Sequence, residues 1–118
     1  MAELNFTPEQ RAAIDTRGST VLVSAAAGSG KTRVLTERLM AYLTDAETPV
    51  DIDRFLVITY TRAAAAELRS RILDGIYARI ASDPENRRLR RQVALCARAE
   101  IGTIHSFCAD FLRANCAA

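Results

Sequence analysis

The amino-acid sequence predicts an α/β fold with about three parallel strands and flanking helices. Short apolar runs alternate along the chain with longer segments in which apolar residues recur at helical spacing. Turn-forming residues separate the two kinds of segment. Strands that alternate with helices pair in parallel through crossover connections, and ligand sites in such structures lie at the carboxyl ends of the strands.

The composition is typical of an ordinary globular protein. The chain has 118 residues, of which 49% are hydrophobic and 25% charged, and this length suits one small domain. No apolar run has the length of a membrane span, and residues 1–10 lack the basic start and apolar core of a signal peptide, so we expect a cytoplasmic protein. The cysteines lack the spacing of a metal site, and we expect buried or incidental thiols at Cys96, Cys108 and Cys116.

Positive charge is concentrated in the middle of the chain. Residues 54–98 carry ten arginines against four acidic residues, whereas residues 1–53 carry five basic and eight acidic ones. Such asymmetry often marks contact with phosphate, but a solvated helix face is the commoner explanation of charge alone. We interpret the run from Arg87 to Arg91 as such a face, with phosphate contact as the alternative.

The first half of the chain predicts helix, strand and helix. Thr7 is a plausible N-cap and Pro8 suits the first helical position, which favours a helix over residues 8–16. Residues 20–24 (TVLVS) form a β-branched apolar run and predict a buried strand. A second helix is expected from Lys31, with Val34, Leu35 and Leu39 at helical spacing, before an acidic loop.

The second half predicts the same alternation. Residues 54–60 (RFLVITY) indicate a second strand, and residues 62–81 indicate a helix with Leu68, Ile72, Ile76 and Ile80 at every fourth position. Asp83 as N-cap and Pro84 in the first turn predict a third long helix. A third strand is expected over residues 100–105 (EIGTIH), followed by a helix with Phe107, Phe111 and Leu112 on one face.

A phosphate-binding loop is predicted between the first strand and its helix. The loop reads AAAGSGKT and comprises Ala25, Ala26, Ala27, Gly28, Ser29, Gly30, Lys31 and Thr32. The two glycines allow backbone N–H groups to surround a phosphate, and the helix start adds its positive dipole. Lys31 is predicted to reach the β and γ phosphates of ATP, and Thr32 to offer a hydroxyl to Mg²⁺. Ala25 stands where the strict pattern has glycine.

Lys31 is the only lysine among sixteen basic residues. A compact ammonium group fits between two phosphate groups, whereas the planar guanidinium fork of arginine does not. This difference explains why a chain that otherwise uses arginine has lysine here. A glycine turn with a chance lysine is the alternative interpretation.

The segments SAAAGSGKTRVLTERL, FLVITYTRAAAAELRSRI and IGTIHSFCADFLR together resemble the N-terminal part of UvrD/Rep-like superfamily 1 DNA helicases, and in particular the AddA group of bacterial helicase-nucleases. The resemblance covers residues 4–115 and implies a partial P-loop NTPase domain of RecA-like fold. It further implies an ATP-driven motor on single-stranded DNA that acts in double-strand-break repair with an AddB-type partner subunit. Residues 1–118 would then be the N-terminal fragment of the first motor domain.

The resemblance also assigns roles to residues on both sides of the loop. Gln10 has two interpretations, the capping partner of Thr7 or the glutamine that in these helicases contacts the adenine edge, and the resemblance favours the second. Arg33 matches a position near the nucleotide, with a solvated arginine as the alternative. Lys31 and Thr32 are the implied catalytic residues, and Thr32 is the implied metal ligand.

DNA contacts are implied for residues that follow the second and third strands, namely Thr59, Tyr60, Thr61, Arg62, Thr103 and His105. Tyr60 is the candidate for base stacking, because stacking tolerates any base, and a core aromatic at a strand end is the alternative. Arg62 departs from the family's usual asparagine and offers charge to phosphate instead. For His105, a hydrogen-bonded spacer is the alternative to DNA contact.

Hydrolysis in this class needs an adjacent Asp-Glu pair at a strand end, and the chain has no two adjacent acidic residues. We therefore expect a fragment that binds nucleotide weakly and has no useful turnover. A small P-loop nucleotide kinase is one alternative, with the arginine-rich helix as a lid. A non-enzymatic module that binds single-stranded DNA or a partner is another.

Overall fold

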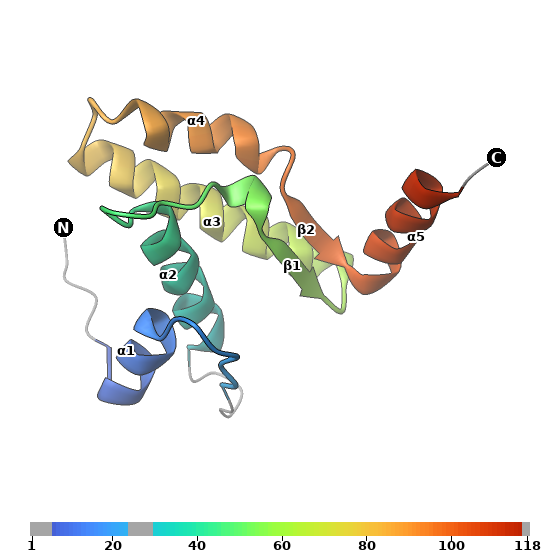
Figure 1. The fold of residues 1–118 in the computed structure, drawn as a ribbon, viewed down its shortest axis with the longest axis horizontal. Coiled ribbons are helices and arrows are strands. Elements are labelled where there is room, and N and C mark those ends of the chain that lie inside the picture. Colours follow the sequence, from blue (N-terminus) through green and yellow to red (C-terminus); the bar gives the residue numbers. More distant parts are fainter. Residues whose placement is uncertain (1–5, 24–29, 117–118) are drawn as a thin grey trace.

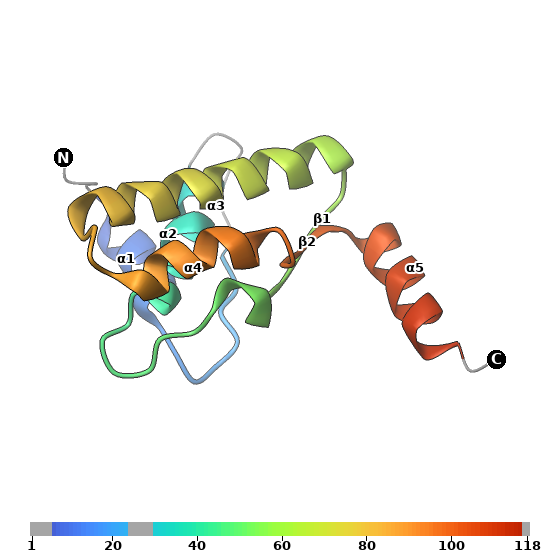
Figure 2. The same cartoon turned by 90° about the horizontal axis from the view of Figure 1, so that it is seen from above.

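The structure is a computed structural model, and it describes residues 6–23 and 30–116. The described elements are the helices α1 (Pro8–Asp15) and α2 (Lys31–Leu43), the short 3-10 helix η1 (Ile52–Arg54), strand β1 (Leu56–Thr59), helices α3 (Arg62–Ser82) and α4 (Arg87–Cys96), strand β2 (Glu100–Thr103) and helix α5 (Ile104–Asn115). In Figures 1 and 2, α3 and α4 lie side by side, while α5 extends away from the other helices beyond the strands.

The strands β1 and β2 form a parallel pair, with Leu56 opposite Glu100 and Thr59 opposite Thr103. Helices α3 and α4 make the crossover between them, which confirms the α/β class with parallel strands. Val57 and Ile101 are buried in the same core cluster as Leu68 of α3. Helix α3 therefore covers one face of the pair.

The third strand that the sequence predicts, over residues 20–24, is wrong for the described part of that run. Residues 20–23 form no strand, and Ser24 lies outside the described residues. A strand is stabilised by backbone hydrogen bonds to a neighbour, and within residues 6–23 and 30–116 none joins this run to β1 or β2. Leu22 is 91% exposed, so apolar composition alone did not bury the run.

The main core lies between α2, α3, α4 and the strands. Ile72 and Ile76 of α3 pack there with Leu43 of α2, and all three side chains are fully buried. Gly75 lets the two helices approach closely, because a Cβ at that position would stand 3.1 Å from Sδ of Met40. The predicted periodicity of α3 is confirmed at Leu68, Ile72 and Ile76, while Ile80 is partly buried.

Two predicted boundaries are wrong. Asp83 is the C-cap of α3, since its N–H donates to the carbonyl oxygens of Arg79 and Ile80, and Asn86 caps α4 by accepting from Leu89 N at 3.2 Å. Helix α3 thus continues to the residue that was expected to begin the next helix. Strand β2 ends at Thr103, because the Thr103 hydroxyl accepts from Ser106 N at 3.1 Å and caps α5.

Candidate functional site

The described part of the phosphate loop begins at Gly30. This residue has φ +86°, the left-handed conformation that favours glycine, and α2 starts immediately after it. Lys31, Thr32 and Arg33 are exposed on the first turn, where the N–H groups of a helix attract anions. The other loop residues that the sequence singles out lie outside the described residues, namely Ala25, Ala26, Ala27, Gly28 and Ser29.

Gln10 caps α1 and also lies beside the loop. Its Oε1 accepts from Thr7 N at 2.9 Å, and Thr7 Oγ1 accepts from Gln10 N at 3.2 Å, which confirms the capping box. The amide nitrogen Nε2 stands 3.7 Å from the place where a Cβ on Gly30 would lie. The capping role is therefore present in a position next to the nucleotide loop, and the adenine contact stays a prediction.

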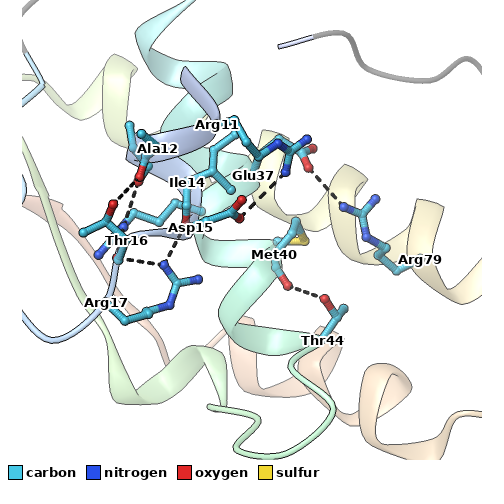
Figure 3. A network of polar contacts seen from close by, with 12 residues as sticks. Arg11, Ala12, Ile14, Asp15, Thr16, Arg17, Glu37, Met40, Thr44 and Arg79 are labelled. Atoms are coloured by element: carbon cyan, nitrogen blue, oxygen red, sulfur yellow. Dashed lines mark hydrogen bonds and ion pairs between the residues drawn. The ribbon is translucent and has the colours of Figure 1, made fainter. Parts of the chain in front are cut away.

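Arg38 of α2 holds α1 in this position. Its guanidinium donates to the carbonyl oxygens of Ala13 and Thr16, both at 2.7 Å, and so satisfies acceptors at the end of α1. Arg17 donates to Ile14 O at 2.7 Å in the polar network of Figure 3, and its guanidinium carbon lies 3.9 Å from the centre of the Tyr42 ring. These contacts fix Gln10 relative to the start of α2.

Arg33 contacts an aromatic ring that sequence reasoning missed. Its guanidinium carbon lies 4.6 Å from the centre of the Phe6 ring, and Arg11 lies 5.2 Å from the same centre. Phe6 directly precedes the N-cap Thr7, and its aromatic character next to that cap was the available signal. The contact orients Arg33 toward the α1 side of the loop, and its role toward a nucleotide stays a prediction.

A second site lies where the two parallel strands end. Helix α3 starts after β1 with Thr61 as its N-cap, and α5 starts after β2 with Thr103 as its N-cap. Because the strands are parallel and in register, both helix N-termini lie at the same edge of the sheet. Two positive dipole ends at one edge favour a phosphate-bearing ligand.

A pocket of about 550 Å³ opens at this edge, and we call it the strand-end pocket. It brings together residues from both connections, which are about 40 positions apart in the chain and meet only because the strands pair. The pocket is lined by Tyr60, Arg62, Thr103, His105, Ser106, Ala109, Asp110 and Arg113. Four of the six residues singled out for DNA contact are in this set.

The side chains of Tyr60, Arg62 and His105 are exposed at the pocket. Tyr60 is 96% exposed, so the interpretation as a core aromatic is wrong. His105 is on the first turn of α5, and no hydrogen bond of its side chain is found within residues 6–23 and 30–116, so the spacer interpretation gains no support there. A planar ring, a guanidinium and an imidazole thus face solvent together.

The three threonines use their hydroxyls within the protein. Thr59 donates to Thr61 O at 3.1 Å, and Thr61 Oγ1 accepts from Ala64 N at 3.0 Å. Thr103 is buried, and its hydroxyl donates to Ser106 Oγ at 2.9 Å. Thr59 and Thr61 are not among the residues that line the pocket. These hydroxyls therefore shape the two helix starts, and direct DNA contact by them stays a prediction.

Sequence reasoning missed the part of the pocket contributed by α5. Ser106, Asp110 and Arg113 recur at helical spacing and form a polar stripe, while Phe107 and Phe111 lie on another face with ring centres 6.1 Å apart. The run of Arg87 to Arg91 is partly structural, because Arg88 pairs with Asp51 at 2.8 Å. Arg87, Arg90 and Arg91 are exposed.

The described residues offer little for a metal ion by themselves. No group of three or more His, Cys, Asp or Glu that would suit a metal is found in the described ranges. The Thr32 side chain is exposed on the first turn of α2, so a Mg²⁺ ion there would be held mainly by phosphate oxygens and water, as Mg²⁺ prefers. No helix in residues 6–23 and 30–116 is long and apolar enough to cross a membrane.

Comparison with known proteins agrees with this geometry. A family model described as the UvrD/REP helicase N-terminal domain matches residues 6–118. Proteins named as subunits of an ATP-dependent helicase/nuclease are similar: that of Clostridium acetobutylicum is 50% identical over 98% of the chain, that of Thermoanaerobacter pseudethanolicus 54% over 93%, and that of Moorella thermoacetica 56% over 92%. The chain spans 9%, 9% and 8% of the length of these relatives. The chain therefore belongs to the UvrD/REP helicase family, and its matched residues correspond to the N-terminal domain of that family.

Proposed function

We propose that the chain is the nucleotide-binding and single-stranded-DNA-binding beginning of the first motor domain of an ATP-dependent DNA helicase/nuclease. The parent protein would act in double-strand-break repair, in the cytoplasm and with a partner subunit of the AddB type. The relatives named as helicase/nuclease subunits support this proposal. The strand-end pocket carries it, since it gathers Tyr60, Arg62 and His105 beside two helix N-termini.

Each group in the pocket would act on a different part of a single strand. Tyr60 offers an exposed ring on which a base stacks, whatever its identity. Arg62 and the N-termini of α3 and α5 offer positive charge and N–H groups to the phosphates. Lys31 and the start of α2 would bind the triphosphate of ATP, and Thr32 would ligate Mg²⁺. The chain would bind nucleotide without sustained hydrolysis, because it has no adjacent Asp-Glu pair.

Titration of a fluorescently labelled single-stranded oligonucleotide with the purified chain tests the proposal. Tyr60→Ala is expected to weaken binding by about 5- to 150-fold, because base stacking on an aromatic ring contributes ~1–3 kcal/mol. Tyr77→Ala is the matched control, since Tyr77 is exposed on α3 and does not line the pocket. Equal affinities for the two variants would overturn the proposed DNA site.

A second assay addresses the nucleotide end. Calorimetry should detect binding of magnesium ATP, and Lys31→Ala should weaken it by roughly tenfold or more, since charge-assisted hydrogen bonds contribute ~1.5–3 kcal/mol. Arg87→Ala is the control for loss of one exposed positive charge. Steady, DNA-stimulated phosphate release that Lys31→Ala abolishes would contradict the absence of turnover.

A further inference from the structure

We propose that Arg113 of α5 is an additional phosphate contact of the strand-end pocket, and that Asp110 competes with the phosphate for it. The inference rests on the proposed function, because it extends the same DNA site along α5. It concerns a residue more than a helical turn beyond the residues that the sequence motifs single out.

Arg113 lies at the far end of the pocket from the strands. Ser106, Asp110 and Arg113 line the pocket and lie on one face of α5. At about 1.5 Å per residue, the face from Ser106 to Arg113 extends the lining ~10 Å away from the strand ends. Arg62 is at the start of α3 and Arg113 is near the end of α5, so the pocket has an arginine on each side of its aromatic ring.

The charge on Arg113 is only weakly engaged within the protein. Asp110 is the one acidic residue in the pocket lining, and its Oδ1 lies 3.6 Å from Nη1 of Arg113. Both side chains are exposed, 62% for Asp110 and 80% for Arg113. An ion pair this exposed contributes little to stability, so it restrains Arg113 only weakly. A phosphate group can replace Asp110, because its oxygens match the guanidinium fork with two hydrogen bonds.

Substitutions of the two residues should change DNA affinity in opposite directions. If Arg113 binds phosphate, removing its charge weakens binding and releases fewer counterions from the DNA. If Asp110 competes for Arg113 and repels phosphate, Asp110→Asn strengthens binding. A structural role of the ion pair would give both variants the same sign, so the two effects separate the explanations.

The experiment measures the dissociation constant of the 118-residue chain for a labelled oligothymidylate at several salt concentrations. Arg113→Gln should reduce the slope of log affinity against log salt by about 0.7, the value for one phosphate contact on a single strand, and weaken binding about fivefold near 0.1 M salt. Asp110→Asn should tighten binding. Arg71→Gln is the matched control, because Arg71 is half-exposed and pairs with Glu67 four residues away.

Each outcome decides a different claim. If Arg113→Gln and Arg71→Gln give the same slope while Tyr60→Ala still weakens binding, the inference about Arg113 is overturned and the proposed function stands. If Asp110→Asn weakens binding, the competition is overturned. If the wild-type chain binds no oligonucleotide at low salt, both the proposed function and this inference fail. Circular dichroism of each variant verifies that its helix content is unchanged.

Discussion

The guanidinium of Arg69 on α3 donates to the carbonyl oxygen of Ile101 on β2 across 3.1 Å. It also donates to the carbonyl oxygens of Ala99, at 3.2 Å, and of Cys96. One partly buried side chain thus satisfies the acceptors between the end of α4 and the start of β2. Because β2 leads directly to Thr103 and α5, Arg69 fixes the half of the strand-end pocket that comes from the second strand.

Arg69→Met is therefore expected to lower the free energy of unfolding by about 2 kcal/mol, since it leaves several carbonyl oxygens without their donor. Arg71→Met is the control one helical step away, and it should cost less than about 1 kcal/mol because its ion pair with Glu67 is exposed. Urea denaturation of the two variants measures the difference. Equal losses would show that the three carbonyl contacts contribute nothing specific.

Asp51 provides a test by pH. The hydrogen bond from Gln92, at 2.9 Å, and the neighbouring Arg88 lower the pKa of the Asp51 carboxyl below its ordinary value of about 4. Because the folded pKa lies below the unfolded one, the carboxylate stabilises the fold above the unfolded pKa, and this contribution is lost as pH falls through the folded pKa.

We expect Asp51→Asn to reduce stability by about 1 kcal/mol at pH 7 and to leave a smaller loss between pH 4 and pH 2 than the wild type shows. Urea unfolding over this pH range provides the measurement. Asp53→Asn is the control, since Asp53 is an exposed carboxylate two residues away. A wild-type acid dependence that Asp51→Asn leaves unchanged would contradict the assignment.

The cysteines should differ in reactivity. Cys96 is 1% exposed and burial raises the pKa of its thiol, whereas Cys108 and Cys116 are exposed. A thiol reagent should therefore modify two cysteines rapidly in the native chain and the third only after denaturation. Cys96→Ala should leave the rapid phase unchanged, and loss of part of that phase in this variant would show that Cys96 is accessible.

Gln10→Glu separates the two roles of Gln10. Glutamate retains the oxygen that accepts from Thr7 N, and a negative charge suits the first turn of a helix, so thermal stability should change little. The variant lacks the amide N–H donors that an adenine N7 acceptor requires. We expect the preference for ATP over GTP to decrease, as measured by calorimetry. An unchanged preference together with unchanged stability would limit Gln10 to the capping box.

Local chemistry made several elements predictable from the sequence. The Thr7 cap with Pro8 predicts α1 to within one residue, and the four-residue spacing of Leu68, Ile72 and Ile76 predicts α3. These signals lie within a few turns of one helix, so no distant contact is needed to interpret them. The parallel pairing of β1 and β2 was also expected from the alternation of strands and helices.

Features that depend on distant partners were less accessible. Residues 20–23 have strand composition, yet a strand exists only where a neighbour supplies hydrogen bonds. Asp83 and Asn86 are both good caps, and the length of α3 decided between them. At the candidate site, motif residues predicted Tyr60 and His105, whereas Arg113 joins the pocket through the direction of α5, which the sequence does not specify.

A motor domain requires that ATP binding at the start of α2 changes DNA binding at the strand-end pocket. This coupling is measured as the affinity of the chain for a labelled single-stranded oligonucleotide with and without a non-hydrolysable magnesium ATP analogue, in the wild type and in Lys31→Ala. We predict a change of about fivefold or more in the wild type, the lower end of ordinary coupling between sites, and none in Lys31→Ala. An oligonucleotide affinity that the nucleotide leaves unaltered in the wild type, under conditions where calorimetry shows the nucleotide bound, would refute the coupling.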